Sequence, residues 1–125
     1  MEHQLKRGCA LVLTGPQGCG KTTLARKIAE AHGSFREIDA MDLDSPFRLG
    51  TALYGEPGTL IVEGYATAAA LRRVKAMLTS DTTTAERKGE KPKQVKSPNF
   101  IFCTGVDNPL QLDRDDRRFR VVRLG

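Results

Sequence analysis

The sequence feature that most limits the fold is the glycine-rich stretch GPQGCGKT at residues 15–22. It matches the pattern G-x-x-x-x-G-K-[ST] and stands between a short apolar run, CALVL, and a segment with helical periodicity, LARKIAE. A strand, a glycine loop and a helix in this order direct backbone N–H groups and a helix N-terminus toward one anion. The stretch therefore predicts an α/β fold with a phosphate-binding loop.

A loop of this kind predicts a nucleoside triphosphate site with defined roles for its residues. Lys21 is expected to reach the β- and γ-phosphates of ATP, and the hydroxyl of Thr22 is expected to ligate Mg²⁺. Cys19 is interpreted as a small filler without a catalytic role. The residues predicted to bind the nucleotide are Gly15, Pro16, Gln17, Gly18, Cys19, Gly20, Lys21, Thr22 and Thr23.

The rest of the chain alternates short apolar runs with segments of helical spacing. This order predicts one α/β domain over residues 1–125 with a mostly parallel central sheet flanked by helices. The first helix is expected to turn Leu24, Ile28 and Ala31 inward. Strands are expected at 9–15, 34–40, 59–64, 99–105 and 119–125, and helices at 21–33, 45–55 and 67–80.

A carboxylate for the metal or for the attacking water is expected at the end of a strand near the loop. Glu63 ends the apolar run TLIV and fits either role, so the choice between metal ligand and water-orienting acid stays open. Its neighbours Val62 and Gly64 are not acids, so the usual adjacent acidic pair is missing. The acids that follow the preceding strand are expected to cap the next helix: Asp39, Asp42 and Asp44.

The net charge and its distribution indicate which kinds of molecule this chain could bind. The chain of 125 residues carries a formal net charge of +5, and five of the eleven residues in ERKGEKPKQVK, at 86–96, are basic. This segment lies within residues 81–98, which we expect to form an inserted basic β-hairpin.

No apolar run approaches the roughly 20 residues of a membrane span. The three cysteines lack metal-ligand spacing and predict reduced thiols in a cytoplasmic protein.

The second half of the chain resembles the superfamily 3 helicase domain, a compact branch of the AAA+ ATPases, in the form found in phage and plasmid primase-helicases. The resemblance covers nearly the full chain and follows the family's order of helix, turn, Thr-rich strand, basic tip, sensor strand and arginine motif. The residues that carry it are Lys75, Ser80-Asp81, Thr82 to Thr84, Arg87-Lys88, Phe100 to Thr104, Pro109 and the run DRDDRRF.

The resemblance implies roles for three further groups of residues. Thr104 would sense the γ-phosphate or its attacking water, with Asn108 as the alternative because Gly105 stands where the family usually has Asn nearby. Arg117 or Arg118 would be the arginine finger that completes a neighbouring subunit's site. The hairpin would enter the channel of a ring and contact nucleic-acid phosphates through Arg87, Lys88, Lys91 and Lys93.

The expected function is Mg²⁺-dependent ATP hydrolysis by a helicase-like ring, with a hexamer as the expected form. It would act on DNA, expected to be single-stranded, in phage or mobile-element replication inside a bacterial or phage-infected cell. Only about seven residues precede the first strand, so we expect dependence on a replication partner protein. Two alternatives stay open: a small-molecule or nucleotide kinase, which GPQGCGKTTLARKIAE also suits, and a nucleotide-gated DNA-binding module with little hydrolysis.

Overall fold

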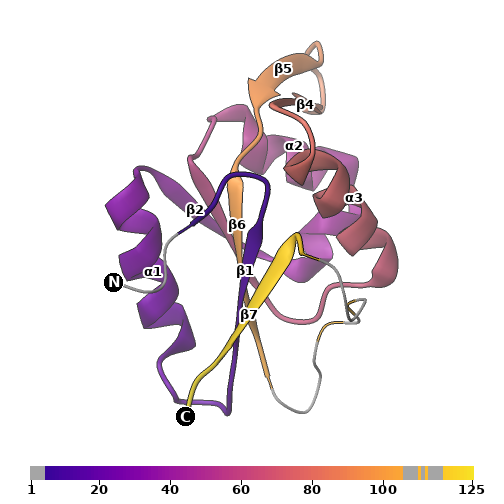
Figure 1. The fold of residues 1–125 in the computed structure, drawn as a ribbon. Helices are drawn as coiled ribbons and strands as arrows, with labels where there is room; N and C mark the ends of the chain where they lie inside the picture. Colours follow the sequence, from indigo (N-terminus) through magenta and orange to yellow (C-terminus); the bar gives the residue numbers. More distant parts are fainter. Residues whose placement is uncertain (1–4, 106–109, 111, 113–116) are drawn as a thin grey trace.

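The computed structural model describes residues 5–105, 110, 112 and 117–125. Its centre is a five-stranded sheet with the order β2-β3-β6-β1-β7, and every neighbouring pair in it is parallel (Figure 1). The predicted α/β fold with a mostly parallel sheet is therefore confirmed. The strands are β1 (Ala10–Thr14), β2 (Phe35–Asp39), β3 (Thr59–Glu63), β6 (Asn99–Thr104) and β7 (Phe119–Arg123).

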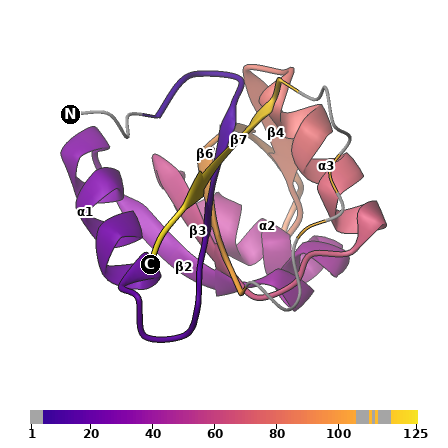
Figure 2. The ribbon, with the colours of Figure 1, turned by 60° about the horizontal axis from the view of Figure 1, so that its bottom comes forward.

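Helices cover both faces of this sheet (Figure 2). One face carries α1 (Lys21–His32), and the other carries the 3₁₀ helix η1 (Ala40–Asp44), α2 (Pro46–Tyr54) and α3 (Ala68–Leu78). Successive residues of β1 serve the two faces in turn, because Leu11 and Leu13 pack with α1 while Ala10 and Val12 pack on the opposite side. Burial on both faces explains why the central strands are continuous apolar runs.

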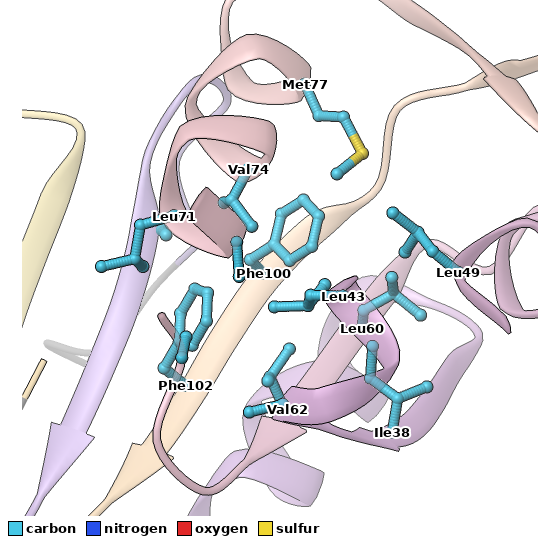
Figure 3. Close-up of a cluster of buried hydrophobic side chains, with 14 of the residues drawn as sticks. Ile38, Leu43, Leu49, Leu60, Val62, Leu71, Val74, Met77, Phe100 and Phe102 are labelled. Carbon is cyan, nitrogen blue, oxygen red and sulfur yellow. The ribbon is translucent and has the colours of Figure 1, made fainter. Parts of the chain in front are cut away.

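The larger core lies on the α2 and α3 face, where aromatic rings from β6 form its centre (Figure 3). The rings of Phe100 and Phe102 stack with their centroids 6.2 Å apart, and Phe102 is 6.3 Å from the ring of Phe119. The inward face of α3 matches the predicted spacing, since Ala70, Leu71, Val74 and Leu78 are all buried.

The inward face of α1 differs in part from the prediction. Ile28 is buried as expected, but Ala31 is exposed, and the contact with the sheet is made by Ala25 and Ala29 with Leu24 half-buried. Small residues at these positions let the helix approach the sheet closely. An alanine on either side of the apolar stripe fits a helix equally well, so the spacing alone did not choose between them.

The acids after β2 cap a helix, as expected, although it is η1 and not α2. Asp39 and Asp42 form a capping box on η1, with the carboxylate of Asp39 accepting from the N–H of Met41 at 2.9 Å. Helix α2 is capped instead by Ser45, whose hydroxyl accepts from Arg48 N–H at 3.3 Å. The carboxylate of Asp44 accepts from the hydroxyl of Thr67 at 3.1 Å, next to the start of α3.

Residues 81–98 contain a two-stranded antiparallel sheet formed by β4 (Thr82–Ala85) and β5 (Lys93–Lys96). The hairpin lies at the end of the molecule opposite the loop between β1 and α1 (Figure 1). Its two inward residues, Ala85 and Val95, are fully buried and belong to the larger core. The segment is therefore part of the packed domain and is not a free linker.

Among the described residues, no helix is both long enough and apolar enough to cross a membrane.

Candidate functional site at the glycine loop and basic hairpin

The loop between β1 and α1 needs its glycines for two different reasons. Gly18 and Gly20 have φ angles of 85° and 90°, which side-chain-bearing residues rarely adopt. A Cβ on Gly15 would instead lie 2.7 Å from both the carbonyl oxygen of Leu124 and the sulfur of Cys19. Backbone conformation requires glycine at positions 18 and 20, and close packing under the loop requires glycine at position 15.

The N-terminus of α1 is open to an external acceptor. Its N-cap, Gly20, offers no side chain, and the first turn contains no acidic residue. In the described part of the chain, no side-chain oxygen accepts a capping hydrogen bond from these N–H groups. Free N–H groups and the positive end of the helix dipole together favour a bound anion such as phosphate.

Lys21, the first residue of α1, folds back on the start of the loop. Its ammonium group donates to the carbonyl oxygen of Gly15 at 2.6 Å and to that of Pro16 at 3.1 Å. The positive charge is thus held beside the open helix N-terminus, where an anion would meet both. The other residues predicted to bind nucleotide surround this point: Gln17, Gly18, Gly20 and Thr23 are exposed, and Cys19 is half-buried.

Thr22 and Glu63 are brought together from different elements. The Thr22 hydroxyl, in the first turn of α1, donates to the Glu63 carboxylate at the end of β3, with 2.5 Å between the oxygens. Strand β6 separates β3 from β1, so no neighbouring-strand register produces this contact. The contact forms because α1 packs across the face of the sheet and brings Thr22 to the end of β3. The predicted Mg²⁺ ligand, Thr22, and the acid predicted to serve either the metal or the attacking water, Glu63, therefore face each other.

The loop lies at the point where the strand order reverses. From β1 the chain passes to β2 on one side of the sheet, and from β6 it passes over β1 to β7 on the other. The carboxyl ends of β1 and β6 therefore border the crevice in which open parallel sheets bind ligands. The N–H of Gly15 donates to the carbonyl oxygen of Thr104 at 3.3 Å and joins the two strand ends.

Thr104 reaches the loop with its backbone, but its hydroxyl points to the other face of the sheet. Side chains alternate along β6, so Thr104 shares the face of Phe100 and Phe102. Its Oγ1 is buried, has no hydrogen-bond partner in the described part of the chain, and borders a cavity of about 580 Å³ with Arg123. The structure thus does not bring this hydroxyl to the Thr22–Glu63 pair. The alternative sensor, Asn108, lies outside the described residues.

The side chain of Cys103 lies on the α1 face of β6, opposite to that of Thr104. This thiol was not predicted to lie near the candidate site. Cys103 pairs with Glu63 across the β3–β6 register and is buried. Burial, and then the charge of Glu63, raise the pKa of the Cys103 thiol to about 12, so it stays protonated at neutral pH. The alternation of FIFCT already predicts that Cys103 and Thr104 face opposite sides.

A second missed feature is an ion pair one helical turn beyond Thr22. Arg26 on α1 donates to both carboxylate oxygens of Glu37 on β2, at 2.6 and 2.9 Å. Hydrogen bonding by Arg26 holds the pKa of the Glu37 carboxyl below its ordinary value, and Glu37 in turn raises the pKa of Arg26, to which Glu63 also contributes. The i, i+4 spacing of Thr22 and Arg26 was the available signal.

The two candidate arginine fingers lie at the far end of β7 from the loop. The carbonyl oxygen of Arg118 accepts from the N–H of Ala10 at 2.6 Å, and Phe119 pairs with Ala10 at the start of β1. The strand separates this point from the loop by about 13 Å. The opposite end of β7 contacts the loop region, where Leu124 N–H donates to Thr14 at 2.7 Å. The aspartates of DRDD, at positions 113, 115 and 116, lie outside the described residues.

The four basic hairpin residues have two different surroundings. Lys88 and Lys91 are exposed in the turn between β4 and β5. Arg87 and Lys93, at the inner ends of this turn, lie against the ring of Tyr54 on α2. The structure therefore brings the four residues to one hairpin, far from the glycine loop (Figure 1).

Comparison with known proteins agrees with this fold. The chain belongs to DUF5906, a family of unknown function, which matches residues 13–118. No curated protein matches the chain.

Among solved structures, the chain is similar to the C-terminal region of NrS-1. The A form apo structure of that region is 29% identical, with a TM-score of 0.71 over 96% of this chain and 30% of that one. Another apo structure of the same region is 28% identical, with a TM-score of 0.76 over 97% of this chain and 30% of that one. The chain thus spans less than a third of the length of these structures.

Proposed function

We propose that this chain is the P-loop ATPase core of a superfamily 3 helicase-like protein that acts on nucleic acid in phage or mobile-element replication. The observation that carries the proposal is the 2.5 Å contact of Thr22 with Glu63, beside an open helix N-terminus and the Lys21 ammonium. The similarity of nearly the whole chain to the NrS-1 C-terminal region supports a replication-related protein of this architecture.

In this proposal the loop N–H groups and Lys21 bind the β- and γ-phosphates of ATP. Mg²⁺, when bound, neutralises the charge that develops on the transferred phosphoryl group. The residues fit that ion, because Mg²⁺ is usually held by one or two protein oxygens together with water and phosphate oxygens. Thr22 and Glu63 supply such oxygens, and their hydrogen bond shows that both reach the same point. Glu63 is alternatively free to orient the attacking water.

The nucleic-acid contacts are assigned to the other end of the sheet. The hairpin carries Arg87, Lys88, Lys91 and Lys93, and cations on such a surface bind phosphates of single-stranded DNA without reading bases. Arg117 and Arg118 immediately precede β7, at its end away from the loop, and are too far from their own loop to serve it. We therefore assign them to a neighbouring subunit's site, which requires a ring such as a hexamer.

The test is phosphate release from ATP with and without a single-stranded oligonucleotide, combined with sedimentation in ATP and Mg²⁺. We expect DNA-stimulated turnover by an oligomer, and a loss of about 100-fold or more in Glu63→Gln with nucleotide binding retained. A monomer with DNA-independent turnover under all conditions would contradict the ring motor.

A second candidate is a nucleotide-gated binding module with little hydrolysis. The observation that favours it is that Glu63 is the one carboxylate, among the described residues, that contacts Thr22. This candidate predicts that Glu63→Gln leaves a low basal turnover unaltered, while ATP still changes the affinity for DNA.

A further inference from the structure

Tyr54, the last residue of α2, contacts both arms of the basic hairpin. The Nζ atom of Lys93, at the start of β5, lies 4.2 Å from the centroid of its ring. The guanidinium carbon of Arg87, just after β4, lies 5.0 Å from the same centroid. The Tyr54 hydroxyl donates to the carbonyl oxygen of Lys91 at 3.4 Å. One half-buried side chain thus holds three points of the turn region.

The backbone of α2 also meets the hairpin directly, one helical turn before Tyr54. A Cβ on Gly50 would lie 1.7 Å from the carbonyl oxygen of Glu86, so the two backbones are in contact. Ala85 and Val95 continue the contact into the core and are buried. The base of the hairpin therefore takes its position from α2, and Tyr54 stands where this fixed base meets the basic turn.

The Tyr54 ring offsets an unfavourable arrangement of charge. Two cations lie within 5.0 Å of one centroid and repel each other. The negative face of the aromatic ring attracts each of them, and Glu90 pairs with Arg87 at 3.2 Å. A pair of cations kept close in this way loses less conformational freedom on binding a phosphate group than two freely moving side chains do.

We propose that Tyr54 is a positioning residue that holds Arg87 and Lys93 as a fixed pair of cations for a phosphate group of single-stranded nucleic acid. This phosphate position lies at the base of the hairpin turn, whereas Lys88 and Lys91 supply independent charges at its tip. The proposal rests on the nucleic-acid binding proposed above. It adds that a residue without charge, on a helix outside the hairpin, sets the affinity.

The experiment compares Tyr54→Leu with Tyr54→Phe, neither of which changes the formal charge. Leucine keeps apolar volume at the site but removes the ring, and phenylalanine keeps the ring and loses only the hydroxyl. The first measurement is tryptic cleavage of the native protein after Arg87 and Lys88, without any nucleic acid. The second is the affinity for an oligothymidylate by fluorescence anisotropy at several salt concentrations. Lys88→Ala with Lys91→Ala serves as the charge-removing reference.

We expect Tyr54→Leu to be cleaved faster and to bind about tenfold more weakly, and Tyr54→Phe to stay within about twofold of the unmodified protein. In the reference variant, the slope of log affinity against log salt concentration should be smaller in magnitude by about 1.4, as the removal of two phosphate contacts on a single strand predicts. Because purely electrostatic binding depends on charge alone, equal affinities of Tyr54→Leu and the unmodified protein would overturn the positioning role.

The two measurements separate this inference from the proposed function. Unchanged cleavage in Tyr54→Leu would overturn the view that Tyr54 orders the hairpin turn, whatever the affinity. If the unmodified protein bound no oligothymidylate, the nucleic-acid part of the proposed function would fail, and the phosphate position would fail with it. Cleavage would in that case still report whether Tyr54 holds the turn.

Discussion

The two ends of the central sheet are organised on different principles. At the carboxyl end, Gly15 to Thr22 form a continuous stretch in which neighbours in sequence are neighbours in space, and Glu63 joins Thr22 from a distant strand. At the amino end, the hairpin depends on α2, about 30 residues earlier in the chain, for its position. A local motif forms the first region, and tertiary docking forms the second.

This difference implies that the two regions can be altered separately. The loop contacts β1, β6, β7 and α1, whereas the hairpin contacts α2 and the larger core. Damage to the loop should therefore leave the hairpin intact, and damage to the docking of the hairpin should affect stability before it affects nucleotide chemistry.

The largest expected effect comes from Lys21→Ala. Removal of the ammonium that donates to Gly15 and Pro16 should lower ATP turnover about 100-fold or more, because the loop then loses the positive charge held beside its open helix N-terminus. Phosphate release and calorimetric nucleotide binding measure the loss. Lys27→Ala, on the exposed side of the same helix, is the matched control and should retain activity. Loss of nucleotide-free DNA binding in Lys21→Ala would show that the two ends are not separate.

The next effect concerns the docking of the hairpin. Gly50→Ala places a methyl group against the backbone of Glu86 and should lower the free energy of unfolding by about 3 kcal/mol, the upper part of the range for overpacking. Gly55→Ala is the control, because no atom lies within 4 Å of its Cβ position and its φ is −80°. Urea unfolding measures both. Similar stabilities of the two variants would contradict close docking of the hairpin on α2.

The smallest effect is the pH response near the loop. Since Arg26 lowers the pKa of Glu37 below its ordinary value of 4.5, this pair stabilises the fold above that pH and loses its contribution as the pH falls through the lowered value. Arg26→Ala should raise the pKa of Glu37 and flatten this part of the acid unfolding curve. The effect is small because both side chains are partly exposed. An NMR titration of Glu37 measures it, and an unchanged midpoint would contradict the assignment.

Much of the fold was predictable because the signals were local. Continuous apolar runs marked the central strands β1, β3 and β6, since these strands are buried on both faces, whereas the alternation of Phe35 and Ile38 with polar residues marked β2. Two arms that contain Thr and Val, on either side of the basic turn, predicted the hairpin that β4 and β5 form. The prediction for the inward face of α1 was wrong at Ala31, where one alanine resembles another and only contact with the sheet separates them.

The candidate site was predictable only in part, for a similar reason. The loop residues follow from one motif, and Glu63 follows from its place at the end of an apolar strand. The direction of the Thr104 hydroxyl, the buried thiol of Cys103 and the Arg26–Glu37 pair depend on which face of the sheet α1 covers. The helix pattern shows that α1 has an apolar face, but it does not say to which side of the sheet that face turns.

The sequence by itself thus determined the order of strands and helices, the glycine loop and the positive charge of the hairpin, because each depends on residues close together in the chain. Only the tertiary structure decided that Glu63 meets Thr22 across an intervening strand, and that Arg117 and Arg118 stand at the far end from the loop. It also decided that Tyr54 on α2 lies against Arg87 and Lys93 of the hairpin. These contacts join segments that no local pattern relates. They form because two apolar faces of one sheet must each be covered by particular helices.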